Sequence, residues 1–220
     1  MEIKAVISDL DGIIVNSETE HFLSFQRMLR LDFGIDYTHE QDKEFLGTTD
    51  AHVFTILKKR YPQIEGPLDK LIERRTKLFL EVFRERAKPL PGVLKFFSYV
   101  KEQKWPLGLG TSASRGVMYF VVETLDLKRF FNTQVCADDV KQGKPAPDIY
   151  LEVARRLNVN PKYCLVFEDS AYGAQAAKAA GMTCVAIPCG PTLKQDLSHA
   201  DHILKSMEEV TPEFLKALFN

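Results

Sequence analysis

Side chains that can do chemistry follow several short apolar segments of this chain, beginning with Asp9 and Asp11. Carboxylates that lie close together repel each other unless a cation neutralises them, and a site built from oxygen ligands favours Mg²⁺. A carboxylate can also attack phosphorus, while lysine and hydroxyl groups can hold the transferring phosphoryl oxygens, so the set predicts magnesium-dependent phosphoryl transfer. The other members of the set are Thr111, Ser112, Lys144, Glu168 and Asp169.

Each of these motifs has a plainer explanation when it is taken alone. An Asp-x-Asp pair is common in turns, and Thr111-Ser112 is a typical N-cap for a following helix. The pair Glu168-Asp169 would fit a solvated loop. The order and spacing of all the groups together favour one active site over several unrelated features.

Apolar, β-branched segments alternate with helical patterns over most of the chain, which is typical of an α/β fold. We expect a doubly wound, Rossmann-like parallel sheet with helices on both faces, in which ligands bind at the carboxyl ends of the strands. The strands are expected at Lys4–Ser8, Leu107–Gly110, Val135–Cys136, Tyr163–Phe167 and Thr183–Ile187. The helices are expected at Val93–Glu102, Arg115–Leu125, Ile149–Leu157, Ala171–Ala180 and Met207–Leu218.

Residues 17–88 break this alternation because their pattern is helical throughout. Apolar residues recur there at helical spacing, and Gly34, Pro62 and the turn Glu65-Gly66-Pro67 separate the helices. The simplest organisation is a small helical domain, residues 17–88, inserted into an α/β core domain made of residues 1–16 and 89–220.

Composition narrows the functional class. The 220 residues carry a formal net charge of −1, which does not fit the basic surface of a nucleic-acid-binding protein. The apolar runs fall short of the ~20 residues that span a bilayer, and the first residues turn polar too soon for a secretory signal. We therefore expect a cytoplasmic monomer that acts on a small molecule. The cysteines, which form no C-x-x-C pair, are expected to be buried thiols and not zinc ligands.

Four motifs resemble those of the haloacid dehalogenase-like hydrolase superfamily, and the resemblance covers nearly the whole chain. They are Asp9-Leu10-Asp11-Gly12, Thr111-Ser112-Ala113-Ser114, Gly143-Lys144-Pro145-Ala146-Pro147-Asp148 and Phe167-Glu168-Asp169-Ser170. Within the superfamily the chain is similar to the β-phosphoglucomutase and phosphatase branch, which carries a helical cap inserted after the first motif. The helical insert predicted above begins at that point.

The resemblance implies a role for each motif residue. Asp9 would be the nucleophile and a magnesium ligand. Asp11 would be the general acid/base and would offer its backbone carbonyl to the metal. Lys144 would neutralise the nucleophile and the transferring phosphate. Asp169 would bind Mg²⁺ directly, with Glu168 as a second ligand or as a partner that supports the ligands.

Phosphate binding would fall to Thr111 or Ser112 together with neighbouring backbone N–H groups, such as that of Ala113. His21 lies where β-phosphoglucomutases have a histidine linked to their acid/base, so we expect it at the substrate. Capped phosphatases often have a histidine there too. A solvent-facing histidine at the start of a helix is the alternative.

The segment Phe45–Asp50 resembles the substrate-specificity loop of the cap. Mutases bind a distal phosphate there with an arginine, whereas this chain has Asp50, whose carboxylate would repel a second phosphate. Mutases also use a cap lysine, for which Arg75 or Lys77 is the nearest match. We therefore predict a magnesium-dependent phosphatase of a small phosphorylated metabolite, such as a sugar phosphate, acting through an aspartyl phosphate. A β-phosphoglucomutase-type mutase is the alternative, and an inactive binding protein on this fold is the third.

Overall fold

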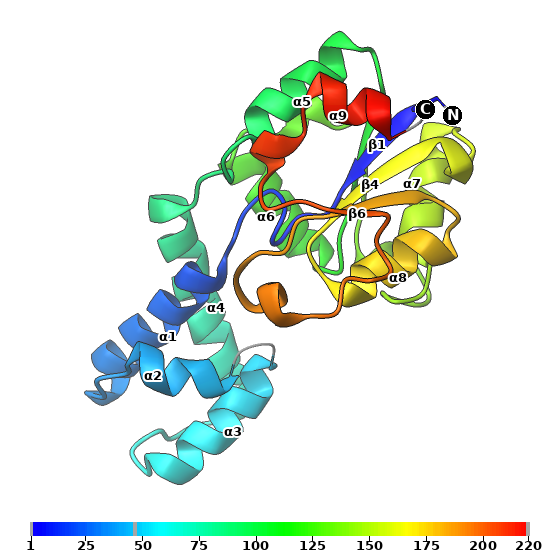
Figure 1. Ribbon diagram of the computed structural model, residues 1–220. Coiled ribbons are helices and arrows are strands. Elements are labelled where there is room, and N and C mark those ends of the chain that lie inside the picture. Colours follow the sequence, from blue (N-terminus) through cyan, green and yellow to red (C-terminus); the bar gives the residue numbers. More distant parts are fainter. Residues whose placement is uncertain (1, 46–47, 219–220) are drawn as a thin grey trace. The chain divides into compact units, whose positions relative to one another are not determined.

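The computed structural model describes residues 2–45 and 48–218 (Figure 1). The chain divides into two compact units. One, called here the α/β unit, comprises Met1–Asn16 and Lys88–Asn220, and the other, the helical unit, comprises Ser17–Ala87. Leu46 and Gly47 of the predicted specificity segment lie outside the described residues.

Within the described residues, the α/β unit contains a six-stranded parallel sheet in the order β3-β2-β1-β4-β5-β6. The strands are β1 (Ala5–Ser8), β2 (Leu107–Gly110), β3 (Thr133–Val135), β4 (Cys164–Glu168), β5 (Thr183–Ala186) and β6 (His202–Ile203). The sheet grows from β1 to β2 and β3 on one side and to β4, β5 and β6 on the other. The predicted doubly wound fold is therefore confirmed, and its topological switch point lies at the carboxyl end of β1.

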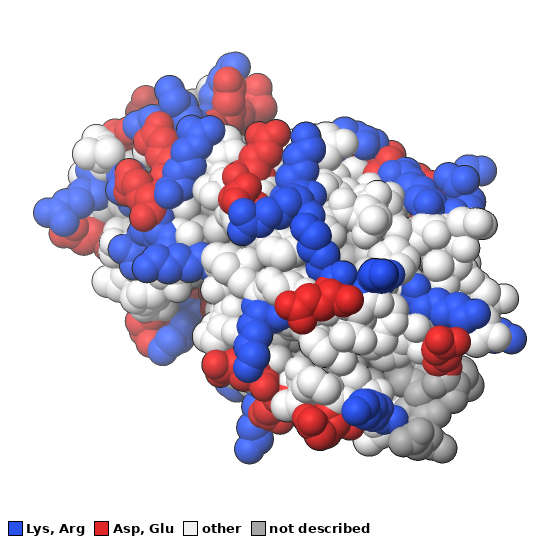
Figure 2. Space-filling view, turned by 90° about the horizontal axis from the view of Figure 1, so that it is seen from above, with Lys and Arg blue, Asp and Glu red and all other residues white. Residues whose placement is uncertain are grey.

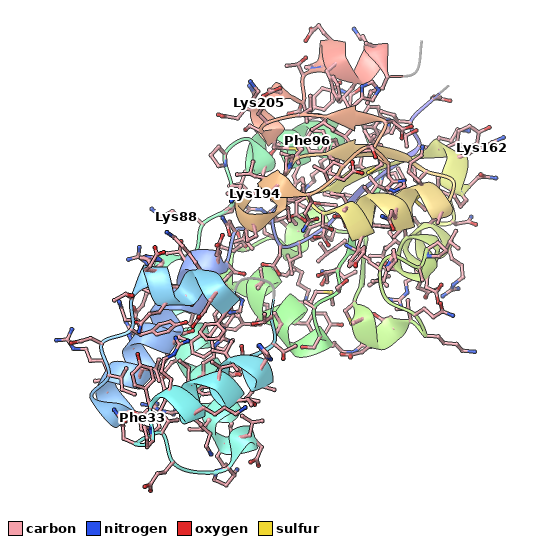
Figure 3. The ribbon with its side chains drawn as sticks, turned by 60° about the horizontal axis from the view of Figure 1, so that its bottom comes forward. Phe33, Lys88, Phe96, Lys162, Lys194 and Lys205 are labelled. Atoms are coloured by element: carbon pink, nitrogen blue, oxygen red, sulfur yellow. The ribbon has the colours of Figure 1, made fainter. Side chains whose placement is uncertain are left out.

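Helices cover both faces of this sheet, which is why every residue of β1 and β4 is buried and apolar runs form these strands. On one face, α7 and α8 pack against the strands through an apolar cluster that includes Ile7, Val153 and Ala174. On the other face lies Phe96 of α5, which is labelled in Figure 3. Its ring contacts that of Phe167 on β4, with the centroids 4.9 Å apart. The helices of this unit are α5 (Val93–Glu102), α6 (Arg115–Thr124), α7 (Asp148–Leu157), α8 (Ala171–Ala179) and α9 (Pro212–Ala217).

Two predicted elements differ from the structure by more than one residue at an end, and the others agree with it to within one residue. The third strand begins at Thr133 and ends at Val135, and Cys136 instead precedes a short 3₁₀ turn. The helix predicted at Met207–Leu218 is wrong as a single element, because Pro212 cannot continue a helix and disfavours helical geometry at the residue before it. The structure has a 3₁₀ turn at Met207–Glu209 and then α9, which the Thr211 side chain caps by accepting a hydrogen bond from the Phe214 amide.

The helical unit is built from α1 (Glu18–Phe33), α2 (His39–Asp42), a 3₁₀ turn at Lys43–Phe45, α3 (Asp50–Arg60) and α4 (Leu68–Arg86). Its core includes Phe22, Phe25, Phe54, Leu57 and Leu78, which recur at helical spacing along the chain. Helix α1 ends at Gly34, where φ is +67° and the amide donates to backbone carbonyls of the last turn.

The remaining 3₁₀ turns lie at Lys128–Phe130, Ala137–Asp139, Pro161–Tyr163 and Gly190–Lys194. Basic and acidic side chains are interspersed on the face that Figure 2 shows, in keeping with the formal net charge of −1. In the part of the chain that the structure describes, no helix combines the length and the apolar composition needed to cross a membrane.

Candidate active site

Asp9 lies at the end of β1, next to the point where the strand order reverses. Its amide donates to the carbonyl of Phe167 on β4 over 3.0 Å, which anchors the residue between two central strands. The residue is buried, and its Oδ1 accepts a hydrogen bond from Nζ of Lys144 at 2.7 Å. Burial raises the pKa of the Asp9 carboxyl well above its usual range; Glu168 and Asp169 add to this rise, while Lys144 opposes it.

Lys144 enters the site from the loop before α7, and its side chain is only 6% exposed. Besides Asp9, its ammonium group donates to Oε1 of Glu168 at 2.5 Å and to the carbonyl of Gly110 at 3.3 Å. Burial lowers the pKa of Lys144, but the charges of Asp9 and Glu168 outweigh this effect and hold the pKa above the ordinary lysine value. The lysine therefore stays charged between two carboxylates.

Glu168, the last residue of β4, is fully buried. Its Oε2 accepts hydrogen bonds from the amides of Asp169 and Ser170 and from the Ser170 hydroxyl. Burial opposes ionisation of Glu168, but Lys144 and these donors hold the pKa of its carboxyl below the usual value. A carboxylate with this many donors has a fixed orientation as well as a fixed charge.

Asp169 follows β4 and is 9% exposed. Its Oδ2 accepts a hydrogen bond from the Thr192 hydroxyl at 3.1 Å. Burial, with the charge of Glu168, raises the pKa of Asp169 to about 7. The charged form of this side chain is thus disfavoured near neutral pH.

The three carboxylates of Asp9, Glu168 and Asp169 present oxygens that lie within 4.8 Å of one another. One lysine balances only part of their charge, and burial together with the neighbouring carboxylates raises the pKa values of Asp9 and Asp169. A buried cluster of oxygen ligands with surplus negative charge fits a divalent cation such as Mg²⁺.

The residues predicted to bind phosphate lie after β2, the neighbour of β1. Thr111 is buried, and its Oγ1 accepts a hydrogen bond from the Ala113 amide at 3.1 Å. Ser112 is exposed between them. The Ala113 amide therefore donates within the loop in this structure.

Asp11 is exposed in the turn that follows Asp9. The Gly12 amide donates to the Val15 carbonyl at 2.7 Å, and Gly12 adopts a φ of +78°, which folds the chain back on itself. A Cβ at Gly12 would lie 2.1 Å from Oδ2 of Asp169. Only glycine lets this turn approach the Asp169 carboxylate so closely.

Two polar residues at the site were not predicted from the sequence. The fully buried Tyr150 of α7 donates its hydroxyl hydrogen to Oε1 of Glu168, and Thr192 donates to Asp169. Tyr150 lies in the apolar stripe of its helix, where an aromatic residue is typical of the core. Thr192 belongs to the 3₁₀ turn at Gly190–Lys194, more than twenty residues from the nearest motif, so spacing alone did not single it out.

His21, the remaining predicted site residue, belongs to the helical unit. It is exposed on one side, while its ring stacks on Phe79 at 4.3 Å between centroids and Nδ1 accepts a hydrogen bond from Arg75. Burial against these neighbours and the charge of Arg75 lower the pKa of His21 to about 3. The imidazole is therefore neutral near pH 7, with its second nitrogen, Nε2, protonated.

Arg75 is itself buried, and Nη1 lies 3.1 Å from Oδ2 of Asp50. Its guanidinium also lies over the ring of Phe25, 4.8 Å from the centroid. The charge of Asp50 is thus compensated inside the helical unit. This pairing weakens the expectation that Asp50 acts as a free repelling carboxylate.

Comparison with known proteins agrees with these motifs. The sequence profile described as haloacid dehalogenase-like hydrolase matches residues 6–187. The chain is 35% identical over 179 residues to the phosphorylated carbohydrates phosphatase of Thermotoga maritima, spanning 81% of this chain and 82% of that relative. It is 30% identical over 182 residues to the fructose-1-phosphate phosphatase of Escherichia coli, spanning 82% and 94%, respectively.

The fold has close counterparts among solved structures. A crystal structure from Thermotoga maritima, whose name assigns it provisionally to the β-phosphoglucomutases, superposes with a TM-score of 0.87 at 32% identity. The match covers 99% of this chain and all of the other. With the profile match over most of its length and relatives at this level of identity, the chain belongs to the haloacid dehalogenase-like hydrolases.

Proposed function

We propose that this protein is a magnesium-dependent phosphatase that hydrolyses a small phosphorylated metabolite, such as a sugar phosphate, through an aspartyl phosphate. The buried contact between Asp9 and Lys144 beside two further carboxylates carries the proposal. Relatives named as phosphatases of phosphorylated carbohydrates and of fructose 1-phosphate support the substrate class.

In the first half of the reaction, a carboxylate oxygen of Asp9 attacks phosphorus and the bond to the leaving alcohol oxygen breaks. Asp11 donates a proton to that oxygen, which leaves an aspartyl phosphate and a free alcohol. In the second half, Asp11 takes a proton from water as the water attacks phosphorus. Inorganic phosphate departs, and both aspartates return to their initial states.

The other residues stabilise charge during both steps. Lys144 donates to Asp9 before the reaction and can donate to a phosphoryl oxygen as negative charge develops there. Thr111 and Ser112 would supply hydroxyl groups to the remaining phosphoryl oxygens. Mg²⁺, held by Asp9, Asp169, the Asp11 carbonyl and directly or indirectly by Glu168, would neutralise the carboxylates and the phosphate.

A mutase of the β-phosphoglucomutase type is the second candidate, because a solved structure provisionally assigned to that class superposes over the whole chain. It would use the same aspartyl phosphate but return the phosphoryl group to a second hydroxyl. Conversion of β-glucose 1-phosphate to the 6-phosphate without release of phosphate would favour this candidate. This chain has Asp50 in the place of the mutase arginine, but Asp50 pairs with Arg75, so the preference for water as the acceptor rests on the relatives named as phosphatases.

The test is release of inorganic phosphate from a panel of sugar phosphates and other small phosphate esters, with Mg²⁺ and with EDTA. We expect magnesium-dependent turnover of at least one member. A folded, magnesium-loaded protein that releases phosphate from none of them and does not isomerise β-glucose 1-phosphate would contradict both candidates. That result would favour a binding protein on this fold.

A further inference from the structure

We propose that Tyr150 and Gly173 are positioning residues for this reaction, which hold the Glu168 carboxylate so that it fixes the Lys144 ammonium against Asp9. The inference deepens the proposed function and rests on it. Neither residue touches the reacting atoms in the scheme above. Both act through Glu168, whose carboxylate accepts a hydrogen bond from Lys144.

The Glu168 carboxylate is enclosed by donors on both of its oxygens. Oε1 accepts from Lys144 and from the Tyr150 hydroxyl. Oε2 accepts from the amides of Asp169 and Ser170 at 3.0 and 3.2 Å and from the Ser170 hydroxyl at 3.1 Å. A buried carboxylate in such a cradle does not change rotamer without losing several charge-assisted hydrogen bonds.

Tyr150 closes this cradle from α7. Its side chain is fully buried, and Nζ of Lys144 lies 5.0 Å from the centre of its ring. The aromatic face therefore shields the ammonium group from water, and the hydroxyl fixes the oxygen to which that ammonium donates. One side chain thus contacts both members of the Lys144–Glu168 ion pair.

Gly173 closes the cradle from α8. A Cβ at this position would lie 1.9 Å from Cδ and Oε1 of Glu168, nearer than two unbonded atoms can approach. Alanine is the better helix former, so the helix itself does not require glycine here. The absence of a side chain at Gly173 makes room for the carboxylate, and any side chain there would displace it.

The consequence falls on Lys144, whose three N–H donors serve Asp9, Glu168 and the Gly110 carbonyl. With Glu168 displaced, Nζ would lose one of its two counter-charges. It would then move toward Asp9, and its position relative to the attacking carboxylate would no longer be fixed. Positioning errors of this kind lower the rate of the chemical step more than they weaken substrate binding.

Tyr150→Phe tests the hydroxyl with the ring retained. Tyr163→Phe is the matched control, because Tyr163 is half-buried between Lys4 and Lys162 in the same unit. The first readout is hydrogen exchange of the Lys144 Nζ protons, measured by NMR on protein with ¹⁵N-labelled lysine side chains and assigned with Lys144→Arg. We expect Tyr150→Phe to speed this exchange by about tenfold or more, as loss of one hydrogen bond to a charged group implies. Tyr163→Phe should leave it unchanged.

The second readout is steady-state kinetics on the best substrate of the panel. We expect Tyr150→Phe to lower kcat by about tenfold while KM changes by less than about threefold. Gly173→Ala should lower kcat by about a hundredfold or more. Its matched control is Gly116→Ala in α6, where a Cβ would meet nothing within 4 Å, and we expect it to keep wild-type kinetics.

The two readouts separate this inference from the proposed function. Hydrogen exchange at Lys144 can be measured on a protein that turns over no substrate. A wild-type protein that hydrolyses nothing would therefore contradict the proposed function, but the exchange experiment would still test whether Tyr150 and Gly173 position Lys144. Unchanged exchange in folded Tyr150→Phe and Gly173→Ala would overturn the inference. A fall in kcat without faster exchange would overturn it too, because these residues would then act on something other than Lys144.

Discussion

Nζ of Lys144 lies 2.7 Å from Oδ1 of Asp9, although 135 residues separate them in the chain. The parallel sheet makes this contact possible, because β1 and β4 end side by side and the loop before α7 reaches the same edge. The ion pair is buried, so its strength depends on the second carboxylate, Glu168, and on any cation that balances the cluster.

Asp9→Asn should abolish turnover while the protein stays folded. Asparagine has nearly the same shape but cannot form the aspartyl phosphate, so we expect kcat to fall by at least about a thousandfold. Phosphate release from the best substrate measures this, with circular dichroism to verify the fold. Asp126→Asn, at an exposed ion pair with Arg129, is the control and should keep full activity. Turnover by Asp9→Asn at the wild-type rate would show that another residue is the nucleophile.

Metal-free protein should lose stability as pH rises from about 4 to about 7. The pKa of Asp169 is raised from 3.8 to about 7 in the folded protein. The folded state therefore binds this proton more tightly than the unfolded chain. The resulting stability is present at low pH and is lost as pH rises through the folded pKa. Melting temperatures in EDTA at several pH values measure this loss.

Two changes should reduce that pH dependence. Mg²⁺ should stabilise the protein at pH 7 and above, by about 2.7 kcal/mol when its concentration is a hundred times its Kd. Asp169→Asn should raise the melting temperature in EDTA near pH 8 and weaken the effect of Mg²⁺. Identical pH profiles for the wild type and Asp169→Asn in EDTA would mean that this carboxylate does not carry the effect.

The sequence predicted those site residues that lie in loops at the carboxyl ends of the strands. Asp9, Lys144 and Asp169 follow short apolar segments, and the order of strands in a doubly wound sheet brings such positions to one edge. Tyr150 could not be found in this way. Its position in the apolar stripe of α7 is typical of a core residue, and its hydroxyl meets Glu168 only when α7 packs on the sheet.

Side-chain contacts between different helices could not be predicted from the sequence either. Asp50 was expected to repel a second phosphate, but the packing of α3 on α4 places its carboxylate 3.1 Å from Arg75. The final helix was predicted too long because its apolar spacing continues across Thr211-Pro212, where backbone geometry interrupts it. The sequence pattern around Asp50 does not reveal its contact with Arg75, and the apolar spacing of the last helix does not reveal the backbone constraint at Pro212.

Asp138→Ala should destabilise the α/β unit by about 1 kcal/mol. Oδ2 of Asp138 accepts a hydrogen bond from the Arg115 amide at 2.8 Å, at the start of α6, where the Ser114 side chain supplies no cap. Urea denaturation measures the change. Asp36→Ala, at an exposed position of the helical unit, is the control and should change stability by less than about 0.5 kcal/mol. Equal stabilities for the two variants would mean that Asp138 does not cap α6.

His21 should remain neutral down to acidic pH because of its burial and the nearby charge of Arg75. Its pKa is lowered to about 3 by burial and by the Arg75 charge, so its ring protons should not titrate between about pH 5 and 8 in NMR spectra. The unfolded chain would protonate near 6.5, so this histidine should cost stability as pH falls from there toward 3. Arg75→Gln should raise the His21 pKa and flatten that loss, whereas Arg74→Gln, which removes the neighbouring arginine paired with Asp32, should change neither. An unshifted His21 titration in Arg75→Gln would leave burial as the sole cause.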